Sequence, residues 1–307
     1  MKNNKKPLII VSILIILMIC AAFTSRSFQN DTFYTIKVGE SIVKNGIDMK
    51  DHFSIHKLAY TYPHWLYDVM TYKLYKAGGL QGLYQITILI FMIIGIIFYL
   101  ANIKKNKSYF ISLLFSILAM IMLARFVTAR AQLITYLLFL IEIILIENLL
   151  KEGKKSDMVG LFLISILIAN LHAAVWPFYF ILMLPYLAEY LIAKITNKIK
   201  NKPKLGIFEK KIDLIQNKNI KYLGLVFLIS LPLGLLTPIG DVPYTYFIKI
   251  LQGNTMQYIN EHKPLVLIEN FFVIGYLCIL LIPLIFTKVK IRLSDLFMIL
   301  GLLFMSF

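Results

Sequence analysis

Cysteine and charge are both scarce in this sequence of 307 residues. The two cysteines, Cys20 and Cys278, lie inside apolar stretches, so neither a disulfide framework nor a thiolate metal site is indicated. Only 16% of the residues are charged, whereas 59% are hydrophobic. A soluble domain of this length could not cover so much apolar surface with so few charges. The composition therefore predicts a polytopic membrane helical bundle of the all-α class.

Motifs for nucleotide and metal chemistry are also missing. The sequence has no phosphate-cradling glycine loop, no GxSxG and no nucleotide-binding signature, which argues against an ATP-driven function. His52 and His56 are four residues apart, but they lack the glutamate of an HExxH zinc motif. We therefore expect no metal site and no cofactor, and dependence on a divalent metal ion stays an open alternative.

Acidic residues are half as numerous as basic ones, 16 against 32, and the formal net charge is +16. In a soluble protein this excess would suggest a nucleic-acid partner, but lysine and arginine also hold membrane loops on the cytoplasmic side. We therefore expect membrane lipids, and no nucleic acid, as partners. The basic loop at 195–221 either lies along anionic lipid headgroups or only anchors the topology, which is the simpler reading. The lysine distribution predicts a multi-pass cell-membrane protein with a cytoplasmic N-terminus.

Nine stretches are apolar enough to suggest membrane-spanning helices. The first has a basic start, as in a signal peptide, but it is long enough to span and is followed by a poor cleavage site, so we expect a retained anchor. The last stops at Phe307 without a polar flank, which predicts a single domain over 1–307 that lacks a C-terminal portion. The nine stretches are 7–24, 83–101, 109–124, 131–150, 157–171, 174–194, 221–239, 266–286 and 294–307.

The first outer loop, 25–82, contains two amphipathic segments that are too polar to cross a bilayer. NDTFYTIKVGESIVKNG, from Asn30 to Gly46, has apolar residues at helical spacing, an i,i+4 pair of Glu40 with Lys44, and a glycine stop. PHWLYDVMTYKLYKAGG, from Pro63 to Gly79, opens on proline, carries tryptophan and tyrosines, and ends on two glycines. Both patterns predict helices that lie in the interface plane and roof over the outer face.

Asp31 stands at the start of the first of these helices. One explanation is a helix cap, a role equally open to Asn30, with a favourable interaction with the helix dipole. The other is a general base or charge-positioning carboxylate at the mouth of a cavity. The position of Asp31 alone favours the explanation that it caps the helix.

Arginines and a glutamine mark the predicted outer ends of two spans. In RFVTARAQ, Arg125 and Arg130 are placed where a guanidinium suits a phosphate, and Gln132 follows as a second polar group entering an apolar helix. The alternative for both arginines is snorkelling to the interface.

Two later segments add polar residues on the same predicted side. ANLHAAVWPFY places Asn170 and His172 at a break between two spans, where a polar turn that satisfies backbone groups is the alternative. YINEHKP adds Glu261. Because all these groups fall on one side, they point together to an extracytoplasmic site.

An ordered set of short motifs resembles a known family. In DTFYTIKVG, Asp31 precedes an aromatic pair, and Gly39 follows eight residues after the aspartate; Thr35 stands where the family has histidine. The later motifs keep the family's order. With the predicted topology, the sequence resembles the GT-C superfamily of integral-membrane glycosyltransferases, and most closely a bacterial, mostly uncharacterised branch that uses polyprenyl-phosphate-linked sugars. The later motifs are DHFS at 51–54, HWL at 64–66, GGLQGLY at 78–84, RAQ at 130–132, NLHA at 170–173, PIG at 238–240 and INEH at 259–262.

The resemblance implies transfer of a hexosyl or pentosyl group from a polyprenyl-phosphate donor to a glycan, lipid or protein acceptor of the cell envelope. Asp31 would be catalytic and would deprotonate or orient the acceptor hydroxyl. Arg130 and Arg125 would hold the leaving phosphate. A lipid phosphate is already a fair leaving group, so no metal ion is obligatory. The other substrate-binding residues expected from the motifs are Gln132, Asn170, His172 and Glu261.

Two other functions are open alternatives. A transporter or flippase for a lipid-linked or anionic substrate would also use arginines and broken helices, but usually within internal repeats, and the sequence shows none. A non-catalytic scaffold of an envelope-assembly complex would fit a chain that lacks its C-terminal portion. Sugar transfer that is lost in Asp31→Asn would separate the enzyme from both.

Overall fold

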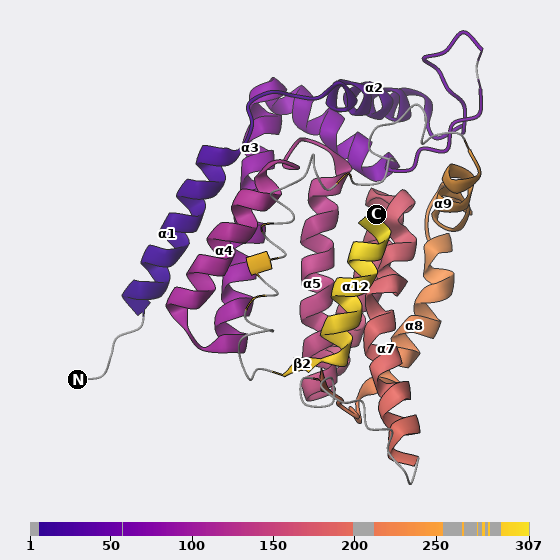
Figure 1. The fold of residues 1–307 in the computed structure, drawn as a ribbon. Coiled ribbons are helices and arrows are strands. Elements are labelled where there is room, and N and C mark those ends of the chain that lie inside the picture. The colour runs from indigo at the N-terminus through magenta and orange to yellow at the C-terminus, as the bar shows by residue number, and fades with distance from the viewer. Residues whose placement is uncertain are drawn as a thin grey trace. The chain divides into compact units, whose positions relative to one another are not determined.

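The computed structural model describes residues 6–56, 58–198, 212–253 and 290–306, together with the isolated positions 266, 275, 278, 279 and 282. Most of these residues are helical, and the prediction of an all-α fold is confirmed (Figure 1). Within the described ranges the only paired strands are β1 and β2, which are parallel and two residues long. The elements are α1 (Lys6–Phe23), α2 (Asn30–Asn45), α3 (Trp65–Asn106), α4 (Tyr109–Ala124), α5 (Ala131–Glu152), α6 (Lys155–Leu171), η1 (Ala173–Val175), α7 (Trp176–Lys198), β1 (Ile212–Asp213), α8 (Ile220–Ser230), η3 (Leu231–Leu235), α9 (Val242–Gln252), β2 (Ile291–Arg292) and α12 (Leu293–Ser306).

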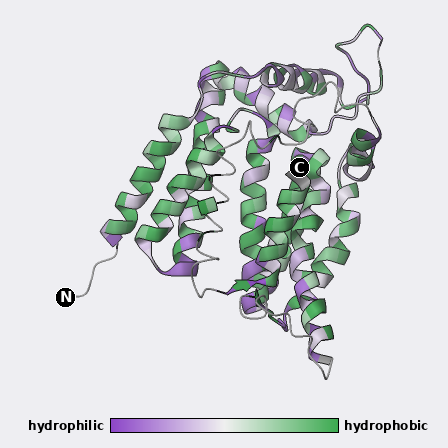
Figure 2. Ribbon diagram, viewed as in Figure 1, coloured by the Kyte–Doolittle hydropathy of each residue, from purple (hydrophilic) through white to green (hydrophobic). Residues whose placement is uncertain are grey.

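Four helical segments of the described chain are long and apolar enough to cross a membrane: Lys6–Phe23, Trp65–Asn106, Ala131–Glu152 and Ala173–Asn197. Figure 2 shows their apolar residues in green. Three shorter apolar helices accompany them, at Tyr109–Ala124, Ile220–Leu235 and Leu293–Phe304. These helices are consistent with a membrane location. Nine spans and a cytoplasmic N-terminus stay predictions, and most of the expected span at 266–286 lies outside the described residues.

The chain divides into two compact units. The first comprises residues 1–145, 161–176 and 232–246, and the second comprises 146–160, 177–231 and 247–307. Every polar residue of the candidate site described below belongs to the first unit. The second unit has its own contacts, among them the hydrogen bonds of Arg292 in β2 with the carboxylates of Glu147 and Asp295.

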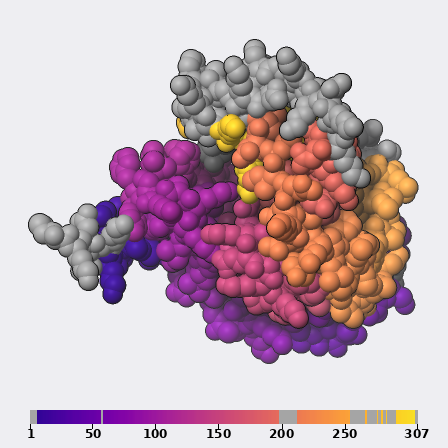
Figure 3. All heavy atoms as spheres, turned by 90° about the horizontal axis from the view of Figure 1, so that it is seen from below, coloured from indigo at the N-terminus to yellow at the C-terminus, as the bar shows by residue number. Residues whose placement is uncertain are grey.

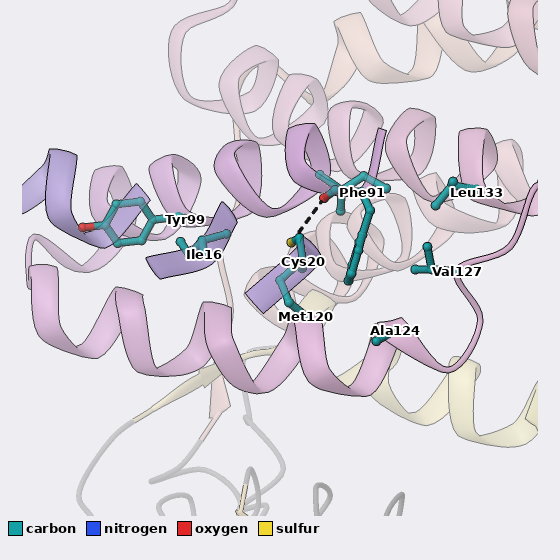
Figure 4. Close-up of a cluster of buried hydrophobic side chains, with 9 residues drawn as sticks. Ile16, Cys20, Phe91, Tyr99, Met120, Ala124, Val127 and Leu133 are labelled. Atoms are coloured by element: carbon teal, nitrogen blue, oxygen red, sulfur yellow. Dashed lines mark hydrogen bonds between the residues drawn. The ribbon is translucent and has the colours of Figure 1, made fainter. Parts of the chain in front are cut away.

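A buried apolar cluster joins α1, α3 and α4 in the first unit (Figure 4). Ile16 and Cys20 of α1 pack on Phe91 of α3, and the Cys20 thiol lies 3.8 Å from the Phe91 carbonyl oxygen. A Cβ atom at Gly95 would lie 2.7 Å from the Ile16 side chain, so glycine permits the close approach of α3 to α1. Seen from below, α1 lies against the purple atoms of α3 and α4 (Figure 3).

The roof of the first unit is formed by α2 and the first part of α3, as the sequence predicts. Figure 1 shows α2 beside the first part of α3, with which it makes its contacts. The α3 ribbon changes direction at Gly79, whose φ of 60° and ψ of −158° interrupt the helix. The two roof helices touch at Gly39, where a Cβ atom would lie 2.0 Å from the Asp68 carbonyl oxygen. Glycine is therefore required at position 39 for this helix crossing.

The start of α2 differs from the prediction. The N-cap is Gln29, and no side chain caps the helix, so the expectation that Asn30 or Asp31 is the cap was wrong. Asp31 lies in the first turn, where its charge suits the helix dipole, but its carboxylate is engaged by an arginine from another element. The predicted pair of Glu40 with Lys44 is confirmed at 2.8 Å.

Candidate functional site

Asp31 of α2 forms an ion pair with Arg130, which precedes α5. Arg130 Nη2 lies 2.6 Å from Asp31 Oδ2, and Arg130 Nη1 donates a hydrogen bond to Gln29 Oε1 at 3.1 Å. The Asp31 side chain is 59% exposed, whereas that of Arg130 is 17% exposed. A second link, from the Thr32 hydroxyl to the Ala129 carbonyl oxygen, fixes the same two segments. Two residues separated by 99 positions in sequence are thus held at the open side of the site.

A second carboxylate lies deeper in the roof. His64 Nδ1 is 2.6 Å from Asp68 Oδ1, and the Asp68 side chain is fully buried, whereas that of His64 is 24% exposed. Asp68 Oδ2 has no hydrogen-bond partner within the described part of the chain. Thr35 of α2 is a further polar side chain beside this carboxyl group. The pair therefore combines a buried, incompletely satisfied carboxylate with an imidazole that reaches the surface.

His172 lies next to this pair, in the connection between α6 and η1. Its ring centroid is 6.4 Å from that of His64, and its Nδ1 is 2.8 Å from the Thr135 hydroxyl. The backbone N–H of Ala173 donates to the Pro63 carbonyl oxygen at 2.7 Å, which brings the two connections together. Burial, and then the charges of His64 and Arg130, lower the pKa of His172 to about 3. His172 is therefore a neutral imidazole at ordinary pH.

Asn170 closes the site on the side of η3. Its side-chain N–H groups donate to the carbonyl oxygens of Ile166 and Leu236, at 2.8 and 3.0 Å. Its Oδ1 accepts from the Trp65 indole N–H at 3.2 Å, and the same N–H reaches the Thr237 hydroxyl at 3.3 Å. Asn170 thus links α6, the start of α3 and the segment after η3. These bonds agree with the alternative that its side chain satisfies backbone groups at a polar turn.

An apolar pocket lies beneath the roof, between the two parts of α3 and the start of α5. It is small, with a cavity volume of about 40 Å³. Tyr67, Ala129 and Leu133 are among the residues that line it, and Ala129 directly precedes Arg130 in sequence. Tyr67 also lies within electrostatic range of Arg130.

The structure gathers four of the predicted site residues, Asp31, Arg130, Asn170 and His172, at one end of the first unit. Arg125 is the exposed C-cap of α4, and Gln132 is half-buried in the first turn of α5. Glu261 lies outside the described residues.

Sequence reasoning missed the pairing of His64 with Asp68 and the contact of Thr135 with His172. The i,i+4 spacing of histidine and aspartate in HWLYD was a visible signal for the first. No sequence signal joins Thr135 to His172, because they are 37 residues apart on different elements.

Within the described residues no group of three or more histidine, cysteine, aspartate or glutamate side chains could hold a metal ion. Comparison of the chain with protein-family models, with curated proteins and with solved structures finds no significant match. The function is therefore argued from the site itself.

Proposed function

We propose that this chain is an integral-membrane glycosyltransferase of the GT-C type, which transfers a sugar from a polyprenyl-phosphate donor to a hydroxyl-bearing acceptor of the cell envelope. The observation that carries the proposal is Arg130, held by Asp31 and Gln29 and next in sequence to Ala129, which lines an apolar pocket. A lipid phosphate needs a cation for its phosphate and an apolar surface for its chain.

In this proposal Arg130 binds the leaving phosphate and stabilises the charge that develops as the bond from the anomeric carbon to the phosphate oxygen breaks. Asp31 and Gln29 hold the guanidinium in place before the donor arrives. His172 is neutral and buried, so it contributes hydrogen bonding rather than charge. The larger role predicted for Asp31 from the sequence, removal of the acceptor's proton, stays a prediction.

The test is a sugar-transfer assay in lipid nanodiscs with a panel of polyprenyl-phosphate sugars and envelope-derived acceptors. Wild type should form product. Arg130→Met should raise the KM for the donor by about 10–100-fold, the loss expected for a charge-assisted hydrogen bond worth about 1.5–3 kcal/mol.

Arg125→Met tests the second arginine predicted to hold the phosphate, which is the exposed C-cap of α4 and has not been placed beside Asp31. It should change the KM much less. Absence of product from folded wild-type protein across the whole panel would reject the glycosyltransferase, and uptake of the donor lipid without transfer would favour the transporter.

A further inference from the structure

Asp31 and Asp68, the two aspartates of the candidate site, are neutralised in different ways. Asp31 is mostly exposed and faces a guanidinium, which carries its charge at every relevant pH. Asp68 is fully buried, and its hydrogen-bonded partner is the imidazole of His64, which is charged only after taking up a proton. The charge of Asp31 is thus compensated permanently, whereas His64 compensates that of Asp68 only when protonated.

Because of this difference, a proton is more favourable on His64 than on Asp31. A proton on Asp31 would disrupt its ion pair with Arg130. A proton on His64 Nε2 converts the pair with Asp68 into an imidazolium–carboxylate pair of no net charge, and a buried, uncompensated carboxylate is costly. The Asp68 contact occupies Nδ1 of His64, so Nε2 is the ring nitrogen left for a substrate.

We propose that His64, oriented by Asp68, accepts the proton of the acceptor hydroxyl. The inference rests on the proposed glycosyl transfer and names its proton acceptor. In these terms His64 is a catalytic residue, Asp68 is a positioning residue, and Asp31 positions Arg130. An imidazole aligned by a buried carboxylate is a recurrent arrangement for removing a proton from a hydroxyl group.

The acceptor oxygen attacks the anomeric carbon of the sugar, and a new C–O bond forms. The bond between that carbon and the donor phosphate oxygen breaks, and its electron pair leaves with the lipid phosphate, which Arg130 binds. The acceptor's proton moves to Nε2 of His64, which later releases it to water.

Several titratable groups surround the pair and contribute to its pH dependence. They come from the roof, from the loop before α3 and from the connections beside α5 and α6. His172 stays neutral under ordinary conditions because of its low pKa of about 3, so it does not compete for the proton. The groups that face the pair or its immediate neighbours are Tyr34, Tyr60, Tyr67, His172 and Arg130.

The experiment measures kcat as a function of pH for nanodisc-embedded wild type, His64→Gln and His52→Gln. His52 is the matched control, because it pairs with Asp48 at the same four-residue spacing but in an exposed loop. Wild type should lose rate as the pH falls and the base becomes protonated. His64→Gln should lower kcat by about 10²–10⁴-fold and abolish this acidic limb, and His52→Gln should change neither.

Asp68→Asn tests the positioning role. It keeps the shape of the side chain but removes the charge that favours the imidazolium, so the acidic limb should move to lower pH while the KM for the donor stays unchanged. Added imidazole should partly restore kcat in His64→Gly but not in Asp31→Asn. A merely structural role for the pair would produce neither the shifted limb nor the rescue.

The outcomes separate this inference from the proposed function. If wild type transfers sugar and His64→Gln keeps both its rate and its acidic limb, the inference is wrong and the proposed function stands. If Asp31→Asn alone removes the limb, Asp31 is the base. If folded wild type transfers nothing across the panel, both fail.

Discussion

Two histidine–aspartate pairs with the same spacing illustrate how burial changes what a pair can do. Asp48 and His52 lie in the loop after α2, with side chains 34% and 37% exposed, and His52 Nε2 is 2.8 Å from Asp48 Oδ2. His64 and Asp68 lie at the start of α3, and their nitrogen and oxygen approach to 2.6 Å with Asp68 fully buried.

The loop pair is fully satisfied by its own surroundings. Asp48 Oδ1 accepts hydrogen bonds from the Lys50 N–H and the Tyr62 hydroxyl, both at 3.2 Å. Although desolvation acts to raise it, these hydrogen bonds and the one with His52 lower the pKa of Asp48 overall. Such a carboxylate stabilises a loop and gains little from a further proton. In Asp68, by contrast, Oδ2 makes no hydrogen bond within the described residues, so this buried carboxylate is less completely satisfied than that of Asp48.

Gly39→Val should have the largest effect on the difference in burial between the two histidine–aspartate pairs. The new side chain would collide with the Asp68 carbonyl oxygen and separate the roof helices, so the buried pair would become exposed like the loop pair. We expect a loss of at least about 3 kcal/mol in the free energy of unfolding. Thermal unfolding in detergent or nanodiscs measures it.

Gly78→Ala is the control for this substitution. Gly78 lies in the same roof, and a Cβ atom there would meet nothing within 4 Å. It should leave the stability unchanged or raise it slightly, since alanine favours the helix. Equal losses in the two variants would contradict the role assigned to the crossing at Gly39.

Asp68→Asn changes the buried pair itself, and it should affect stability in the direction opposite to Gly39→Val. It removes an incompletely satisfied buried charge, so we expect stability to be unchanged or to rise by about 1–2 kcal/mol while transfer falls. Asp48→Asn should weaken its loop without a matching effect on transfer. A clear loss of stability in Asp68→Asn would mean that the buried pair is structural, as the loop pair is.

The smallest effect expected is a pH dependence from His172. Its pKa in the folded protein is about 3, against an ordinary value of 6.5, so the unfolded chain takes up a proton that the folded protein excludes between these values. Stability from this group is complete above about pH 6.5 and falls as the pH drops towards 3. Unfolding compared at about pH 7 and about pH 5 should show a smaller loss in His172→Gln than in wild type. Equal losses of stability in wild type and His172→Gln would contradict the conclusion that His172 is buried and neutral.

Much of the fold was predictable from the sequence, because apolar length and helix-breaking residues decide it locally. The helix at 109–124 and the break at Gly79 are where hydropathy and glycine place them. The same reasoning identified Asp31, Arg130 and His172, because polar groups at the ends of apolar helices are conspicuous.

The pairings within the site could not be predicted, since they depend on contacts between distant segments. The sequence shows the spacing of His64 with Asp68 and of Asp48 with His52 equally well. In the structure α2 packs closely on the Asp68 backbone at Gly39, and the Asp68 side chain is buried whereas that of Asp48 is not. The expected cap role of Asp31 failed for a related reason, because Arg130 arrives from a segment 99 residues away and takes the carboxylate.

The most direct test of the central claim is the affinity of the nanodisc-embedded protein for polyprenyl phosphate compared with the uncharged polyprenol. Wild type should prefer the phosphate, and Arg130→Met should remove this preference by raising the Kd for the phosphate about 10–100-fold while binding of the polyprenol is unchanged. An equal affinity for the two lipids in wild type, or a preference for the phosphate that survives in Arg130→Met, would contradict it.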